Sequence, residues 1–220
     1  MKLSLQMIAD RIMHFKPRIY LNKTDKPIIK SVKLMSREPW SVDSTAIYIA
    51  KSDYFQKGYL SENGTNLLVI GNDEEVNSFF NESSYNVIII DAKYELESVL
   101  NEIQSIFEFY NDWEDEIQDS IINNKGLQNL IDKSYKVFSN PMFLLDSAFI
   151  TLGYSREIDA NDLDSLWSSV ASEGHMDLAI IRSLRDTGTL EYLNTLKCAT
   201  IFKHEGSKYK SIVVNIWSGT

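Results

Sequence analysis

Hydrophobic positions in the first third of the chain change from helical to strand-like spacing. Leu5 and Ile8 begin a helical repeat, which Pro17 ends. Five short apolar runs then predict strands: RIYL, SVKLM, AIYIA, NLLVIG and NVIIID. The last two runs are apolar throughout and flank a helix-like segment at 72–80, which is typical of buried parallel strands. We therefore predict a small N-terminal α/β domain over residues 1–92, with a partly parallel sheet.

A longer helical pattern fills the middle of the chain. Apolar residues recur every three or four positions over 94–122, and a second amphipathic pattern covers 127–138. The stripe fits a coiled-coil seam that pairs two chains, and it also fits a helix packed along its own sheet. The two readings are compatible. We treat residues 93–138 as a helical connector and expect a homodimer through the 94–122 helix.

The last third opens on a helix break at Asn140-Pro141. MFLLD and FITLGYS predict a hairpin, and Asp162 is a candidate cap for the helix that follows. Two more short helices precede KCATIFK and YKSIVVNIW, which predict a second strand pair. This order predicts an antiparallel sheet with helices inserted after its first hairpin. The fold class is then α/β plus α+β, with a second domain over 139–220.

Charge and composition narrow the function classes. The formal net charge of −9 argues against nucleic-acid binding by the whole chain. The first forty residues are nevertheless basic, whereas residues 71–122 are acidic with a single base, Lys93. No apolar run is long enough to span a bilayer, the N-terminus lacks the apolar core of a signal peptide, and one cysteine allows no internal disulfide. We expect a cytoplasmic protein without a membrane partner.

The sequence contains few patterns typical of catalytic or metal-binding sites. The chain contains neither a phosphate-binding loop nor a nucleophile elbow. His14, His175 and His204 lack metal-ligand spacing, and Cys198 lies in a strand pattern typical of a core position. We assign no catalytic residue, metal or cofactor. The alternative is a small α/β enzyme whose site lies at the carboxyl ends of the parallel strands, near Asp91.

The last third holds a candidate binding pocket between its sheet and its helices. Amphipathic or charged side chains that would face such a pocket are Tyr154, Trp167, His175, Arg182 and Trp217. Core packing is the competing explanation for the two tryptophans, and a solvated helix position is the competing explanation for Arg182.

The order of segments resembles the N-terminal regulatory region of purine-catabolism-regulator-like (PucR/CdaR-type) bacterial transcription regulators. The matching pieces are LSLQMIADRI, NLLVIG, NVIIID, IFEFYNDWEDEIQDSI and LQNLIDKSYKVFSNPMFLLDSAFITLGYS. The last of these is similar to the start of a GAF- or PAS-like sensory domain. The resembling pieces are patterns of apolar residues, so they carry over no ligand-binding residue.

The resemblance implies a regulator that senses a small metabolite and changes its grip on DNA. In that family the DNA-reading helix-turn-helix lies C-terminal to the regulatory region. We therefore expect a ligand-sensing, dimerising regulatory fragment whose sensory domain is truncated. DNA would be contacted only through a segment absent from this chain.

Overall fold

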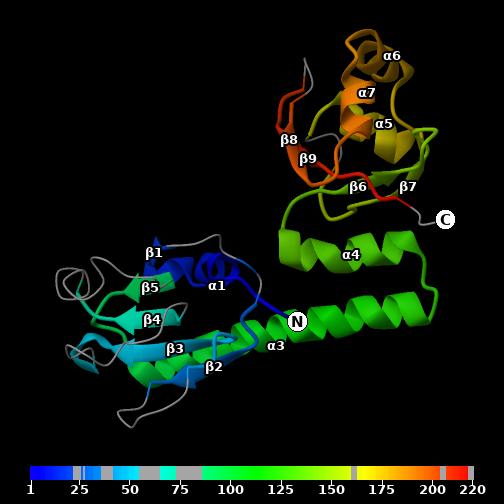
Figure 1. Cartoon of the computed structure of the whole chain (residues 1–220). Helices are drawn as coiled ribbons and strands as arrows, with labels where there is room; N and C mark the ends of the chain where they lie inside the picture. Colours follow the sequence, from blue (N-terminus) through cyan, green and yellow to red (C-terminus); the bar gives the residue numbers. More distant parts are fainter. Residues whose placement is uncertain are drawn as a thin grey trace. The chain divides into compact units, whose positions relative to one another are not determined.

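The computed structural model describes residues 1–21, 26, 28–35, 42–54, 65–72, 86–159, 163–203 and 207–217 (Figure 1). The chain divides into two compact units, Met1–Asp115 and Glu116–Thr220. The helix predicted at 72–80 lies outside the described residues except for Asn72.

The first unit is built on a five-stranded mixed sheet in the order β1-β5-β4-β3-β2. Its strands are β1 (Arg18–Tyr20), β2 (Ser31–Leu34), β3 (Ala46–Lys51), β4 (Asn66–Ile70) and β5 (Asn86–Ile90). Strands β2 to β5 pair in parallel, and β1 pairs antiparallel with β5 at one edge. All five residues of β4 are buried, as expected for a central parallel strand. The predicted α/β character and partly parallel sheet are confirmed.

The starts of three parallel strands are joined by the side-chain amides of a buried and a half-buried asparagine. Asn66 is only 2% exposed, and its Nδ2 donates to the Ser44 carbonyl over 3.1 Å. The Asn86 Nδ2 in turn donates to the Asn66 Oδ1 over 3.3 Å. Residue 44 precedes β3, so this chain of bonds fixes the register of β3, β4 and β5 at one edge of the sheet.

Helices α1 (Leu5–Arg11) and α3 (Leu96–Ile122) supply further core of the first unit, and short 3-10 turns follow α1 (Met13–Phe15) and β3 (Ser52–Tyr54). The Ser4 hydroxyl caps α1 by accepting from the Met7 amide. Arg11 stacks over the Phe109 ring of α3, with its guanidinium carbon 4.2 Å from the ring centroid.

The apolar stripe of α3 is largely buried in its own chain. Within the first unit the buried positions are Val99, Ile103, Ile106, Phe107 and Tyr110. This burial matches a helix packed along its own sheet rather than a free seam. At the end of α3 the stripe is open, since Ile121 is 62% and Ile122 is 79% exposed.

The second unit begins in α3 and continues with α4 (Leu127–Phe138). The elements that follow are β6 (Phe143–Leu145), β7 (Thr151–Tyr154), α5 (Ser165–Ser172), α6 (Leu178–Asp186), α7 (Thr189–Asn194), β8 (Thr200–Phe202) and β9 (Ser211–Val213). Both predicted strand pairs are present and antiparallel. The predicted helices are present too, but α5 is capped by Asp164, whose side chain accepts from the Trp167 amide. Asp162, the predicted cap, lies outside the described residues.

The four strands of the second unit form two separate two-stranded sheets, not the single antiparallel sheet that we expected. The reason lies beside β7. The Thr151 amide donates to the Gly174 carbonyl, and the Met176 amide donates to the Phe149 carbonyl. Residues 174–176 thus occupy the position that another strand would need. Among the described residues, no helix combines the length and apolarity required to cross a membrane.

Candidate ligand site

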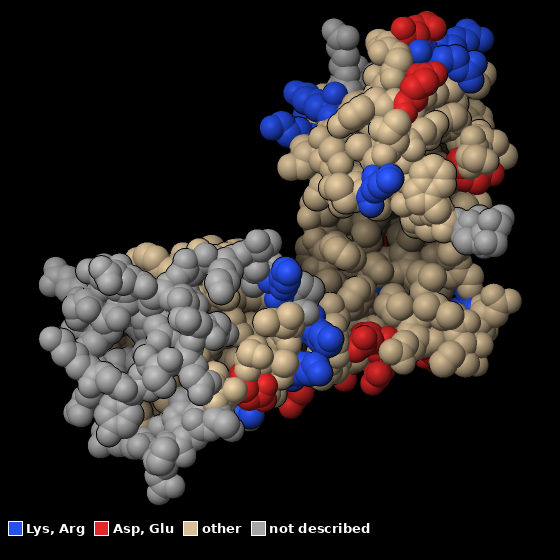
Figure 2. All heavy atoms as spheres, in the orientation of Figure 1, with Lys and Arg blue, Asp and Glu red and all other residues tan. Residues whose placement is uncertain are grey.

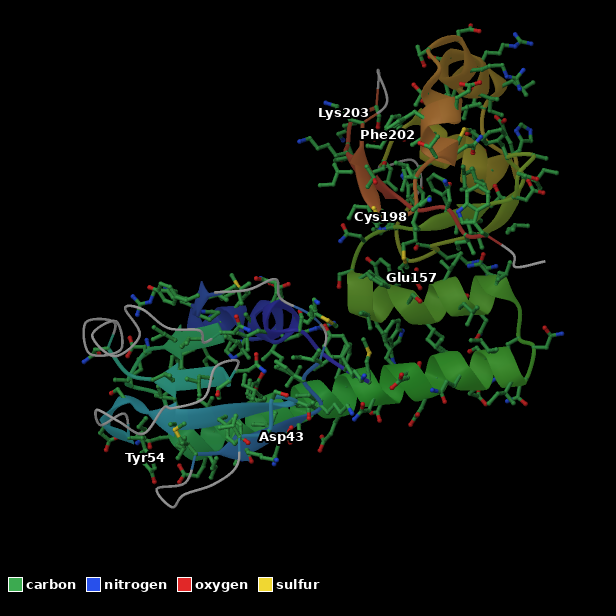
Figure 3. The ribbon with its side chains drawn as sticks, viewed as in Figure 1. Asp43, Tyr54, Glu157, Cys198, Phe202 and Lys203 are labelled. Atoms are coloured by element: carbon green, nitrogen blue, oxygen red, sulfur yellow. The ribbon has the colours of Figure 1, made fainter. Side chains whose placement is uncertain are left out.

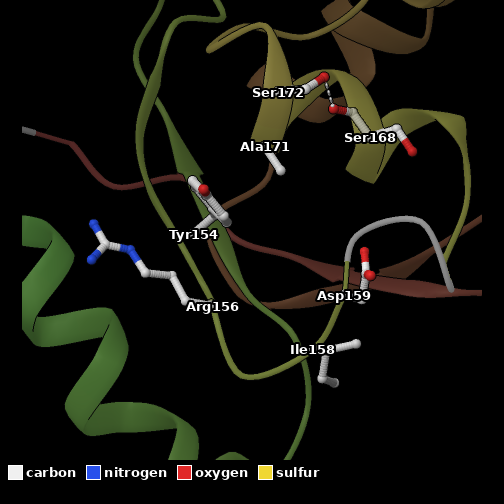
Figure 4. A pocket seen from close by; sticks show the side chains of 7 residues that line it. All are labelled: Tyr154, Arg156, Ile158, Asp159, Ser168, Ala171 and Ser172. Atoms are coloured by element: carbon white, nitrogen blue, oxygen red, sulfur yellow. Dashed lines mark hydrogen bonds between the residues drawn. The ribbon is translucent and has the colours of Figure 1, made fainter.

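A hollow of about 420 Å³ opens in the second unit beside the end of β7 (Figure 4). Tyr154 and the segment after β7 form one wall, and α5 forms the other. The lining residues are Tyr154, Arg156, Ile158, Asp159, Ser168, Ala171 and Ser172. The volume lies within the range of about 300–1,000 Å³ that small-molecule sites occupy.

The groups that line the hollow are mostly polar. Ser172 donates its hydroxyl hydrogen to the Ser168 carbonyl over 2.6 Å, so its oxygen remains available as an acceptor. The Tyr154 hydroxyl makes no hydrogen bond within the described part of the chain and can donate to a bound molecule. Arg156 and Asp159 are exposed, and Figure 4 shows the Arg156 side chain extending away from the other lining side chains. Ile158 and Ala171 offer the apolar contact. This lining suits a small polar molecule with a compact apolar part.

The backbone of Tyr154 is held by a side chain of α4. The Ser155 amide donates to the Met142 carbonyl, on the side of β7 that faces β6. Backbone groups of successive residues in a strand point to opposite sides, so those of Tyr154 point away from β6. There the Gln128 amide bonds to both of them. Its Nε2 donates to the Tyr154 carbonyl over 2.7 Å, and its Oε1 accepts from the Tyr154 amide over 3.1 Å. Gln128 thus replaces a neighbouring strand at this one residue.

Helix α4 packs closely on β7 because Gly153 has no side chain. A Cβ atom placed on Gly153 would lie 2.8 Å from the Ile131 Cδ1 and 3.3 Å from the Gln128 Cα. A larger residue would require the Ile131 side chain to shift and the backbone of α4 to move by a few tenths of an ångström. The absence of a side chain here sets the distance that lets the Gln128 amide reach Tyr154.

On its other side α4 is bound to the end of α3. Glu116 accepts from Lys136 over 2.7 Å and pairs with Lys133 over 3.3 Å. The Ser120 hydroxyl donates to the Asn129 Oδ1 over 2.7 Å. The hydrogen bond from Lys136 is the main cause that lowers the pKa of the Glu116 carboxyl below its ordinary value. A continuous set of contacts therefore runs from the hollow through Tyr154 and α4 to the last turns of α3.

The structure brings one of the five predicted pocket residues, Tyr154, to the hollow. Trp167 precedes a lining residue but packs edge-on against Phe143 of β6, with ring centroids 4.9 Å apart. His175 forms a backbone bridge with Ile150, and its Nδ1 lies 3.0 Å from the Met176 carbonyl. Arg182 is exposed on α6, and Trp217 is 69% exposed beyond β9.

Asp91 lies at the carboxyl end of β5, as the alternative enzyme hypothesis requires, but its bonds are local. Its Oδ1 accepts from the Lys93 amide over 2.9 Å, which closes a turn before α3. Within the described ranges, no group of three or more His, Cys, Asp or Glu side chains is arranged to hold a metal ion. Cys198 is exposed just before β8, so the core position predicted for it is wrong (Figure 3).

Sequence reasoning missed the other six lining residues and Gln128. Arg156, Ile158 and Asp159 follow β7 directly, so their place after a predicted strand was a usable signal. The serines of α5 and Gln128 carried no such signal, because a polar residue on a helix is ordinarily solvated. Comparison of the chain with protein-family models finds no match, and neither do comparisons with curated proteins and with solved structures.

Proposed function

We propose that this chain is the ligand-sensing and dimerising regulatory fragment of a PucR/CdaR-type bacterial transcription regulator. In this proposal the second unit is a GAF/PAS-like sensor, and DNA is contacted by a separate helix-turn-helix segment. The order of hairpin, helices and hairpin after a long helix supports the sensor assignment. The hollow beside β7 is the proposed metabolite site.

One observation carries the proposal. The Gln128 amide bonds to both backbone groups of Tyr154, a residue that lines the hollow. A molecule that moves Tyr154 must therefore stretch these bonds or move α4 with it. Because α4 is paired with α3 through Glu116, occupancy of the hollow changes the end of α3. A sensor needs such a path from ligand to output helix.

A thermal-shift screen of the purified chain tests the sensing part. The panel contains purine bases and small carboxylic acids. A molecule that binds the folded chain at a hundred times its Kd adds about 2.7 kcal/mol of stability. Tyr154→Ala should abolish the shift. Tyr192→Ala, at a 53% exposed position on α7, is the matched control and should retain it. If no compound in the panel raises the melting temperature, the sensing proposal loses its basis.

Hydrogen exchange measures the proposed path to α3. A bound compound should change the protection of amides in α4 and in residues 116–122, and Gln128→Ala should reduce that change. Protection confined to the walls of the hollow would show binding without transmission.

Light scattering tests the dimer. We place the contact at the exposed end of the 94–122 helix, where Ile121 and Ile122 are open. Ile122→Lys should weaken association, whereas Gln104→Lys, at an exposed polar position of the same helix, should not. A monomer at the highest soluble concentration would overturn this part.

A further inference from the structure

The hollow beside β7 is lined mainly by groups that accept hydrogen bonds. Asp159 contributes a carboxylate, and Ser172 contributes an oxygen whose hydrogen is already donated to the Ser168 carbonyl over 2.6 Å. The Tyr154 hydroxyl can accept as well as donate. Figure 4 shows the Asp159 carboxylate directed toward α5. A molecule in the hollow therefore meets more acceptors than donors.

The positive charges of the second unit are placed away from these acceptors. Arg156 is the one basic residue among the described lining residues, and its side chain extends away from the others in Figure 4. Two groups of basic side chains in Figure 2 lie where Figure 1 places β8 and α6. Their exposed members include Lys203 directly after β8 and Arg182 and Arg185 of α6, and neither element contributes to the lining. Asp159 therefore gives the hollow a negative charge.

The end of α5 adds to this negative character. Two of the lining residues, Ala171 and Ser172, belong to the last turn of the helix, which ends at Ser172. Aligned peptide dipoles leave a partial negative charge at the C-terminus of a helix, and cations are stabilised there. The last turn of α5 holds no basic side chain that would complement this charge. An anion in the hollow would meet the dipole and Asp159 together, whereas a cation is favoured by both.

The apolar lining limits what else the ligand carries. Ile158 and Ala171 are half-buried side chains of the lining, and they can contact a short hydrocarbon chain. The volume of about 420 Å³ lies near the lower end of the range of about 300–1,000 Å³ for small-molecule sites. The hollow therefore suits a small molecule with one charged end and a short apolar part.

We propose that the hollow binds a small primary amine. Its ammonium group is held by the Asp159 carboxylate and the Ser172 oxygen, and its hydrocarbon part lies against Ile158. An ammonium group has three N–H donors and no acceptor, which matches a lining of acceptors. Its hydrogen bonds to a carboxylate are charge-assisted, and such bonds are about twice as strong as neutral ones. This inference rests on the proposed metabolite site and names the class of its ligand.

Titration with three compounds of one chain length tests the class of ligand. Butylamine, butyrate and 1-butanol share a hydrocarbon part and differ in charge, and the amine is a cation at neutral pH, as a lysine side chain is. Isothermal titration of the full chain should show saturable binding of butylamine. The other two compounds should bind at least about tenfold more weakly, because they lack the charge-assisted bond. Butyrate that binds as tightly as butylamine would overturn the proposal.

A single substitution tests the place of binding. Asp159→Asn removes the charge, keeps the shape of the side chain, and should raise the dissociation constant of butylamine at least about tenfold. Asp186→Asn, at an exposed position of α6, is the matched control and should leave that constant unchanged. The chain has a net charge of −9, so equal affinity in Asp159→Asn and the parent would mean that the overall charge attracts the amine. That result would overturn the proposal, and so would a loss of binding in Arg156→Gln but not in Asp159→Asn.

The outcomes separate this inference from the sensing proposal when butylamine joins the thermal-shift panel. A purine base or a carboxylic acid that raises the melting temperature, with no response to butylamine, would overturn the amine assignment and leave sensing intact. Binding of butylamine without any change of hydrogen exchange in residues 116–122 would support the amine assignment and contradict transmission to α3. No response to any of these compounds would overturn both.

Discussion

The Gln128 side chain bonds to both backbone polar groups of Tyr154, at 2.7 and 3.1 Å, and so joins α4 to the strand that lines the hollow. A glutamine amide has the donor and acceptor of a peptide group, which lets it take the place of a neighbouring strand. The same amide also donates to Asp132 over 2.6 Å, which orients it within α4.

Gln128→Ala should destabilise the chain by about 1–3 kcal/mol, because it leaves two backbone groups of a half-buried strand without their partner. Gln128→Glu retains an acceptor for the Tyr154 amide but brings a carboxylate against the Tyr154 carbonyl, so it should also destabilise. Gln118→Ala, at an exposed position of α3, is the control. Urea unfolding measures all three, and equal midpoints would contradict the role assigned to Gln128.

Gly153→Ala should cost about 1–3 kcal/mol, because its Cβ would press on the Ile131 Cδ1 and the backbone of α4. Ile131→Val removes that Cδ1 and should recover part of the loss in the double variant. A double-mutant cycle of urea unfolding measures the coupling. Additive losses in the cycle would mean that the two residues do not press on each other.

Acid should loosen the contact between α4 and α3. Lys136 and Lys133 hold the pKa of Glu116 below its ordinary value of 4.5. A lowered pKa in the folded chain means that the contribution is complete above pH 4.5 and is lost as the pH falls through the folded value. The carboxylate is 38% exposed, so we expect only about 0.2–1 kcal/mol.

The comparison that isolates Glu116 is Glu116→Gln against Glu108→Gln, which lies at an exposed position of the same helix. Melting curves at pH 7 should separate Glu116→Gln from the parent, and the gap should narrow as the pH falls below 4.5. A gap that stays constant over this range would assign the effect to packing rather than to charge.

Asn66→Ala should destabilise the first unit by about 1–3 kcal/mol, because it removes a buried donor from Ser44 and an acceptor from Asn86. Asn101→Ala, at an exposed position of α3, should be near neutral. Hydrogen exchange in β3, β4 and β5 locates the effect. Unchanged protection at the ends of these strands would show that the amides do not fix the register.

Local patterns were enough to predict most elements. NLLVIG and NVIIID form β4 and β5, and the repeat over 94–122 forms α3. A strand buried on both faces is a continuous apolar run, and a helix buried on one side has an apolar residue every three or four positions, so both can be recognised in the sequence. The sequence did not decide whether the apolar stripe of α3 pairs with a second chain or packs on the sheet of its own chain. The question is resolved along Val99 to Tyr110 by burial within the chain, which depends on contacts with distant residues.

The site was much harder to predict than the elements. Trp167, His175 and Trp217 have side chains typical of ligand sites, yet Trp167 packs on Phe143 and Trp217 faces solvent. The lining residues come together because the end of β7 lies beside one face of α5. This tertiary arrangement leaves no periodic pattern in the sequence. Gln128 shows the same limit, since its role depends on Gly153 admitting α4 at close range.

The boundary between the two units falls at residues 115 and 116, inside α3 and not in a linker. Proteases favour exposed loops, so limited digestion should cut elsewhere and leave this junction intact. A recombinant piece that starts at Glu116 would begin within a helix, with its first amides deprived of their carbonyl partners. Expression of the second unit alone should therefore start at or before the first turn of α3, near Leu96.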